Sequence, residues 1–160
     1  MKKFAFLILS LINAALTAVY VALSPLEIVP MHYNIDGVAD SYSSKWFVMF
    51  MPCILIVLGI IYLIYGFVAE RYENLLKNQK YVGRIVLGLF LFFIILFWYL
   101  TIICISGATK MGNAFEYILA AAVGALMLFI SNILPKIKQN SSRGIKTPAT
   151  LSSEKVWKKT

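Results

Sequence analysis

The sequence predicts an all-α integral membrane protein, a bundle of four transmembrane helices with both chain ends on the cytoplasmic side. The composition, four long apolar segments and the distribution of basic residues support this prediction. The 160 residues are 61% hydrophobic and 14% charged, and the mean hydropathy is +0.81. Soluble domains have a smaller apolar share. We therefore expect lipid to surround most of the side chains.

Four segments are long and apolar enough to cross a hydrocarbon core of roughly 30 Å, which takes about 20 residues. They lie at about residues 4–23, 46–69, 85–106 and 117–134, and none contains Lys, Arg, Asp or Glu. The first segment follows two lysines, as a secretory signal does. Its apolar run is longer than a signal core and no Ala-x-Ala site follows, so we expect it to be retained as a span.

The basic residues orient the spans, because Lys and Arg of short loops stay on the cytoplasmic side. One side carries thirteen basic and three acidic residues, a net charge of +10, and the other carries two basic and four acidic residues, a net charge of −2. We therefore expect a multi-pass membrane protein with its N- and C-termini inside. The overall charge of +8 reports this topology and gives no reason to expect nucleic-acid binding.

Polar and small residues inside the spans make further predictions. Asn13, near the middle of the first span, needs a hydrogen-bond partner there. Cys53 and Cys104 both lie within spans, and their spacing indicates neither a disulfide framework nor a zinc site. No charged residue lies at the middle of a span, which argues against a pump or channel. Small residues make the first and fourth helices the best candidates for tight packing, at Ala14, Ala15, Ala18, Ala120, Ala121, Gly124 and Ala125.

The outer loop, residues 24–45, is expected to be ordered. Pro25 and Pro30 stiffen its first half, and residues 34–37 have the composition of a turn. The loop contains the chain's one histidine, His32, for which three roles stay open. It can make structural hydrogen bonds, act as an acid or base, or bind a divalent metal with nearby carboxylates, although the spacing matches no established ligand pattern. These weak metal candidates are His32, Glu27, Asp36 and Asp40.

Residues 1–134 are predicted to form the transmembrane domain, and residues 135–160 a basic cytoplasmic tail. Pro135 ends the fourth helix, and the basic residues that follow suit the surface of an anionic leaflet. Ser152 or Ser153 can start a short helix, with Glu154 near its positive end and Trp157 facing the membrane. Docking of a cytoplasmic partner is the alternative role of this tail.

Two motifs, in this order along the chain, resemble known bacterial membrane families. The outer loop, Pro30-x-His32-x-Asn34-x-x-Gly37-x-x-Asp40 followed by Ser44-Lys45, resembles a membrane domain of unknown function. The tail resembles the SdpI-type immunity-protein family in a motif that comprises Asn132, Pro135, Lys136, Lys138, Asn140, Arg143, Gly144, Lys146, Thr147, Pro148, Glu154 and Trp157. Lys146 and Ala149 depart from the Arg and Trp that are common in that family.

The resemblance implies a bacterial plasma-membrane protein that protects its producer against a secreted toxin peptide and signals to a transcriptional repressor inside. We expect no enzymatic activity and no cofactor. The predicted contact surface for the toxin is the outer loop, through His32, Asn34, Gly37, Asp40 and Lys45, while the tail motif recruits the inner partner. Two alternatives stay open: an accessory subunit of a peptide exporter or permease, and a membrane metalloenzyme that uses His32.

Overall fold

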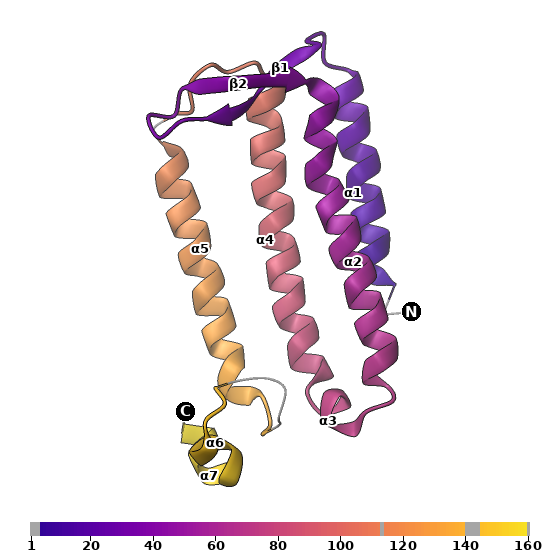
Figure 1. Ribbon diagram of the computed structural model, residues 1–160, viewed down its shortest axis with the longest axis vertical. Coiled ribbons are helices and arrows are strands. Elements are labelled where there is room, and N and C mark those ends of the chain that lie inside the picture. The colour runs from indigo at the N-terminus through magenta and orange to yellow at the C-terminus, as the bar shows by residue number, and fades with distance from the viewer. Residues whose placement is uncertain (1–3, 113, 140–144, 160) are drawn as a thin grey trace.

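The computed structural model describes residues 4–112, 114–139 and 145–159. Long helices lie side by side, and a small sheet lies across one end of them (Figure 1). The long helices are α1 (Ala5–Ala22), α2 (Phe50–Ala69), α4 (Gln79–Ile105) and α5 (Ala114–Ile133). The shorter elements are the 3-10 helices η1 (Lys45–Met49) and η2 (Leu134–Lys136) and the helices α3 (Glu73–Leu76), α6 (Pro148–Ser152) and α7 (Glu154–Lys159).

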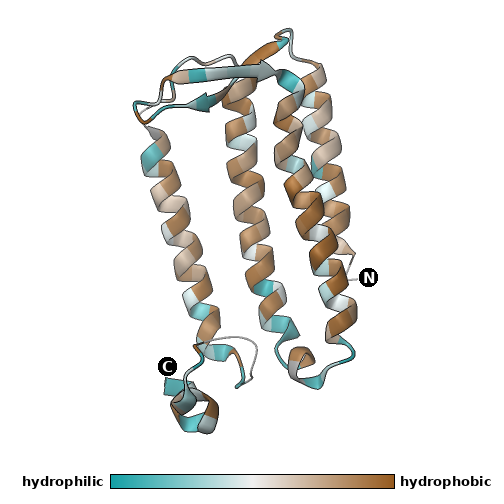
Figure 2. Cartoon of the chain, in the orientation of Figure 1, coloured by the Kyte–Doolittle hydropathy of each residue, from teal (hydrophilic) through white to brown (hydrophobic). Residues whose placement is uncertain are grey.

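The described residues include four helices that are long and apolar enough to cross a membrane, as predicted. Apolar residues cover the four long helices, and polar ones gather in the connections and the C-terminal helices (Figure 2). The candidate spans are Ala5–Ala22, Lys45–Ala69, Gln79–Ile105 and Phe115–Lys136. The helix α4, which contains the third predicted span, begins six residues before that span. Its first turns, with Lys80 and Arg84, are helical but polar.

The prediction of an all-α fold is wrong in the loop between α1 and α2. This segment forms an antiparallel hairpin of β1 (Ile28–Tyr33) and β2 (Ala39–Ser44), in which Ile28 pairs with Ser44 and Tyr33 with Ala39. Pro30 suits such a strand because proline, which lacks an N–H, is tolerated at sheet edges. The strand β2 reads Ala-Asp-Ser-Tyr-Ser-Ser. It lacks the apolar alternation that marks a strand in a sequence.

The helices α1, α2 and α4 form the packed part of the bundle. One buried cluster joins Phe6, Leu55 and Phe90, one from each helix. Ser10 and Asn13 find hydrogen-bond partners within this unit, since lipid offers them none. Ser10 Oγ donates to the Leu55 carbonyl at 2.9 Å, and Trp98 Nε1 donates to Asn13 Oδ1 at 2.8 Å. Asn13 thus has the hydrogen-bond partner that it was expected to need, and this partner is the indole of Trp98 in α4.

The helix α5 packs chiefly against α4, whereas α1 packs chiefly against α2. The expectation of tight packing therefore agrees with α1 but is wrong for α5. Within the apolar stretch of 18 residues that marks each candidate span, 6% is buried for the span that contains α5, against 28% for α1. Small residues permit close approach but do not choose the partner. The close approach lies instead at Gly59 of α2, where an added Cβ would lie 3.1 Å from Leu7 Cα and 3.0 Å from Ser10 Oγ.

We predict that Gly59→Ala lowers the free energy of unfolding by about 1–3 kcal/mol, the usual cost of overpacking. The backbone of α1 cannot move aside as a flexible side chain would, so the two helices must separate. The measurement is unfolding in detergent micelles. Gly124→Ala is the matched control, because a Cβ there meets nothing within 4 Å and alanine favours a helix. Equal stability of the two variants would contradict the prediction.

Candidate binding site at the hairpin end

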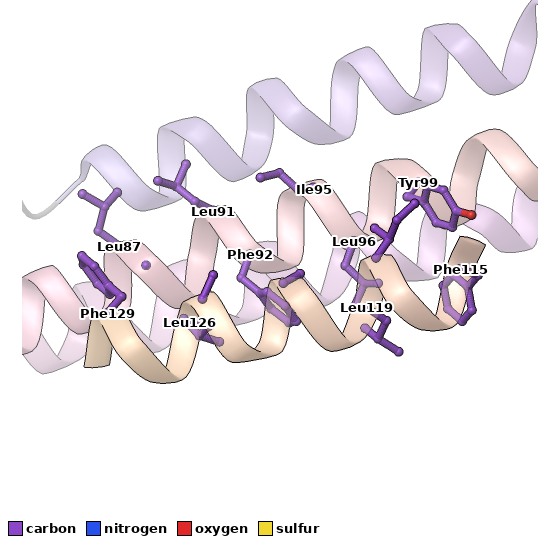
Figure 3. A pocket seen from close by; sticks show the side chains of 14 residues that line it. Leu87, Leu91, Phe92, Ile95, Leu96, Tyr99, Phe115, Leu119, Leu126 and Phe129 are labelled. Atoms are coloured by element: carbon purple, nitrogen blue, oxygen red, sulfur yellow. The ribbon is translucent and has the colours of Figure 1, made fainter. Parts of the chain in front are cut away.

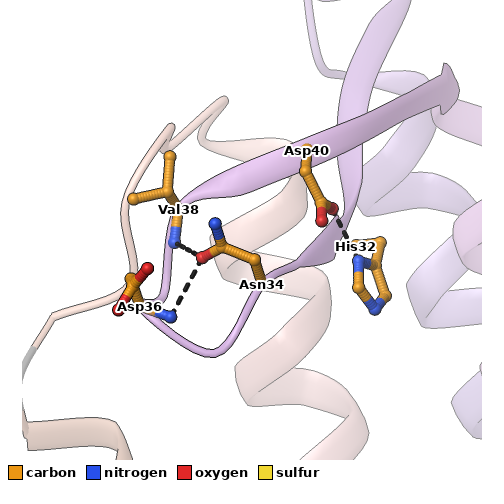
Figure 4. Close-up of polar contacts among 5 residues, drawn as sticks. All are labelled: His32, Asn34, Asp36, Val38 and Asp40. Atoms are coloured by element: carbon orange, nitrogen blue, oxygen red, sulfur yellow. Dashed lines mark hydrogen bonds and ion pairs between the residues drawn. The ribbon is translucent and has the colours of Figure 1, made fainter.

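The turn of the hairpin is held by the side chain of Asn34. Its Oδ1 accepts hydrogen bonds from the backbone N–H groups of Asp36, at 3.0 Å, and Val38, at 2.9 Å (Figure 4). Gly37 has a φ of +72°, a backbone conformation that residues other than glycine rarely adopt. Two residues of the loop motif, Asn34 and Gly37, thus fix the shape of the turn, as the sequence predicted for residues 34–37.

His32 and Asp40 form a pair across the two strands. The distance from His32 Nδ1 to Asp40 Oδ1 is 2.6 Å (Figure 4). An ionised carboxylate only accepts hydrogen bonds, so Nδ1 carries the proton and Nε2 of a neutral ring is an acceptor. The imidazole is well exposed, with 68% of the side chain accessible. Asp40 therefore orients a histidine that presents Nε2 to the surroundings.

Lys45 lies at the base of the hairpin. Its side chain is 7% exposed, and Nζ donates to the Ser24 carbonyl at 2.9 Å and to Glu27 Oε1 at 3.0 Å. Lys45, predicted to shape or line the contact surface, is too little exposed to line it, and that it shapes this surface stays a prediction. The ammonium joins the end of α1 to the start of η1, which is a structural role.

A third segment, residues 107–112 between α4 and α5, clamps the hairpin. Met111 N donates to the Gly37 carbonyl at 2.7 Å, and Ala39 N donates to the Thr109 carbonyl at 2.9 Å. Tyr33 Oη donates to the Ala108 carbonyl at 2.8 Å. Burial, with smaller contributions from Cys104 and Tyr42, raises the pKa of Tyr33 to about 12, so the phenol keeps its proton at neutral pH. The sequence did not predict this clamp, because residues 107–112 contribute backbone groups to all three contacts.

A pocket of about 450 Å³ lies beneath the turn, between the hairpin and the ends of α4 and α5. This volume is within the usual range of ligand pockets. Its polar lining comes from His32, Asn34, Asp36 and Glu116. Its apolar lining includes Met51, Leu100, Met111 and Phe115. The pocket therefore suits a ligand with both polar and apolar parts.

The four weak metal candidates do not come together. Glu27 forms an ion pair with Lys45. Among the four candidates, the described contacts pair His32 with Asp40. In the described part of the chain no group of three or more His, Cys, Asp or Glu residues could hold a metal ion. The geometry therefore gives the metalloenzyme alternative no ligand set.

At the opposite end, the tail is fastened to the bundle by Asn78, the residue before α4. Asn78 is fully buried. Its Nδ2 donates to the Lys138 carbonyl at 3.0 Å, and its Oδ1 accepts from Lys138 N at 2.9 Å. Trp157 Nε1 donates to the Ile137 carbonyl at 2.7 Å. The indole N–H is thus bound by the tail itself, and that the ring faces the membrane stays a prediction.

The two short tail helices explain several residues of the tail motif. Thr147 and Thr150 form a reciprocal capping box that starts α6, with Pro148 in its first turn. Ser153 begins α7, as one of the two predicted alternatives had it, through a hydrogen bond from Val156 N to Ser153 Oγ at 3.4 Å. Glu154 pairs with Lys158 at 2.9 Å, and this hydrogen bond lowers the pKa of Glu154. Thr150 was missed because a capping box usually has Glu or Gln at that position. Asn78 was missed because its partner, Lys138, lies 60 residues further along the chain.

The remaining tail residues are less engaged or lie outside the described residues. Lys136 Nζ donates to Asn132 Oδ1 at 3.3 Å on the surface, and Pro135 lies in η2 directly after α5. Lys146 is exposed. Asn140, Arg143 and Gly144 lie outside the described residues.

Comparison with known families gives a match in the first part of the chain, which is compatible with a membrane domain. Residues 8–57, just under a third of the chain, match the family described as a domain of unknown function (DUF1648). The match runs from α1 through the hairpin into α2. No curated protein and no solved structure matches the chain.

We predict that Lys45→Met lowers the free energy of unfolding by about 1–3 kcal/mol, because hydrogen bonds to a charged group contribute about that much. The loss stays below that of a fully buried pair, since the Glu27 side chain is 76% exposed and remains hydrated. Lys110→Met, at an exposed position of the same end, is the control. Unfolding in detergent measures both, and an unchanged Lys45→Met would show that the pair contributes nothing.

Proposed function

We propose that this chain is a non-enzymatic immunity or sensor protein of the bacterial plasma membrane, which binds a secreted toxin peptide at the hairpin. One observation supports this above all: a stiff hairpin, tied at three places, lies across the end of an otherwise apolar bundle (Figure 1). Its ties are the Asn34 turn, the clamp on residues 107–112 and the Lys45 anchor. Such rigidity lowers the entropic cost of binding.

The exposed face of the hairpin offers both polar and apolar contacts to a peptide. His32 presents Nε2, oriented by Asp40. Ile35, at the tip of the turn, is 96% exposed, which is unusual for a large apolar side chain in an ordered turn. An amphipathic peptide that lies on a membrane surface carries both kinds of group, so it is complementary to this face.

The proposal places the hairpin outside the cell and the tail inside. The charge pattern supports this orientation, because the described residues of the tail end carry Arg71, Lys77, Lys80, Arg84 and the basic tail, while the hairpin end carries Lys45 and Lys110. Residues at the two ends of the bundle are therefore expected to differ in their access to reagents added outside.

We predict that a cysteine at Ile35 reacts with a membrane-impermeant maleimide in intact cells, whereas a cysteine at Lys146 reacts only after the cells are permeabilised. Both positions are exposed in the structure, so burial does not explain a difference. The measurement is a gel shift in a background where Cys53 and Cys104 are replaced by alanine. Labelling of Lys146→Cys in intact cells would contradict the proposed orientation and indicate that the tail lies outside.

The tail serves, in this proposal, to hold a cytoplasmic repressor when toxin is bound. Binding outside changes the inner face only if the peptide binds two arrangements of the bundle unequally. The tail is suitably placed for this, because Asn78 fastens it to the start of α4, the helix whose other end supports the hairpin through residues 107–112.

We predict that the chain protects a sensitive bacterium against a toxin peptide of the kind that SdpI-type immunity proteins resist, and that His32→Ala reduces survival at least tenfold. Ser41→Ala, exposed on the neighbouring strand, is the control and keeps protection. Survival is counted after challenge, with membrane insertion checked by blotting. An inserted wild-type chain that gives no protection would overturn the proposal, and full protection by His32→Ala would remove His32 from it.

A further inference from the structure

A groove runs between α4 and α5 over much of their length. The two helices touch at both ends of it: the Phe129 ring lies against Gly88, where an added Cβ would come within 2.5 Å of the ring, and the rings of Tyr99 and Phe115 stack at 5.5 Å. Between these contacts the side chains leave a space of about 460 Å³ (Figure 3). Its lining is apolar apart from the Tyr99 hydroxyl and includes Leu91, Ile95, Leu119, Ala122 and Leu126.

The groove is longer than one layer of a bilayer. At 1.5 Å per residue, Gly88 and Tyr99 lie about 16 Å apart along α4, and Phe115 and Phe129 lie about 21 Å apart along α5. Half of a hydrocarbon core of roughly 30 Å is about 15 Å. From the hairpin end the groove therefore passes the midplane, and it offers one extended acyl chain a continuous apolar lining.

The groove adjoins the pocket beneath the hairpin at Phe115, which lines both and stacks on Tyr99 between them. That pocket lies at the end of the spans, where lipid headgroups are found. Two carboxylates, Asp36 and Glu116, line it, and no Lys or Arg is among its described lining residues. Its charge therefore favours a cationic group and disfavours an anionic one.

We propose that this combined site binds one membrane lipid with an ammonium headgroup, taken from the leaflet on the hairpin side. The acyl chain lies in the groove between α4 and α5, and the ammonium lies near Asp36 and Glu116. The headgroup end of this lipid site borders the proposed peptide contact, because His32 and Ile35 also line the pocket. Its acyl-chain groove contains no hairpin residue, so lipid binding there does not depend on the peptide.

The width of the groove argues for an acyl chain rather than a helix of a partner or of a second copy. Helices in contact have axes about 8–10 Å apart, and α4 and α5 touch at both ends of the groove. A helix with its side chains is about 10–12 Å wide, so it cannot enter between them. An unbranched hydrocarbon chain can.

The first test uses the full-length protein in nanodiscs of phosphatidylethanolamine and phosphatidylglycerol with identical acyl chains, followed by native mass spectrometry of the lipid retained. The wild-type protein is expected to retain phosphatidylethanolamine at least fivefold over phosphatidylglycerol. Ala122→Phe fills the groove and should lose most of this retention. Ala121→Phe is the control, because Ala121 is exposed and does not line the groove. Equal retention by the two variants would overturn the proposal.

The headgroup is tested by Asp36→Asn combined with Glu116→Gln, which should bring the preference for phosphatidylethanolamine close to onefold while retention of lipid continues. A preference that survives this change would overturn the assignment of the ammonium to these carboxylates. His32 stays unchanged in every variant, so the toxin-survival measurement remains an independent readout. Loss of lipid with full protection, or the reverse, separates the two proposals.

A second measurement needs no substitution and so does not depend on how the variants fold. A phosphatidylethanolamine with a photoreactive group on its acyl chain is incorporated and activated in the native protein. Adducts should concentrate on residues 87–99 and 115–129, which line the groove. Even labelling of the exposed faces of α1 and α2 would identify ordinary surrounding lipid and overturn the proposal, as would a co-purified peptide that blocks labelling of the groove.

Discussion

The hydrogen bond from Met111 N to the Gly37 carbonyl, at 2.7 Å, is the contact on which the rest of the hairpin end depends. It joins the connection between α4 and α5 to the turn of the hairpin, segments more than 70 residues apart. The pocket exists because this contact holds the turn above the ends of these two helices. Gly37 makes it possible, since its φ of +72° turns the backbone as few other residues allow.

The sequence predicted the parts of the structure that depend on local pattern. Hydropathy located the four helices, Asn34 and Gly37 indicated the turn, and Ser153 indicated the start of a tail helix. The hairpin was missed because β2 is almost wholly polar. Its pairing is fixed by the turn and by contacts with residues 107–112, which periodicity does not report.

Two residues make contacts that the sequence did not predict. Lys45 was assigned to the contact surface as part of the outer-loop motif, and Trp157 to the membrane side of a tail helix. Each donates to a backbone carbonyl, of Ser24 for Lys45 and of Ile137 for Trp157. Such partners are set by tertiary structure, and so is the choice of α2 over α5 as the neighbour of α1. Small residues reveal where helices can approach, but only the geometry at Gly59 shows which ones do.

The buried amide of Asn78 has a consequence for the order in which the protein is assembled. Its hydrogen bonds go to Lys138, which the ribosome adds 60 residues later, after the whole of α4 and α5. Until then the amide must remain hydrated, so the turn before α4 stays at the membrane–water interface while α5 enters the bilayer. The packed unit of α1, α2 and α4 can therefore form during synthesis, whereas the tail end closes only once translation has passed the final span.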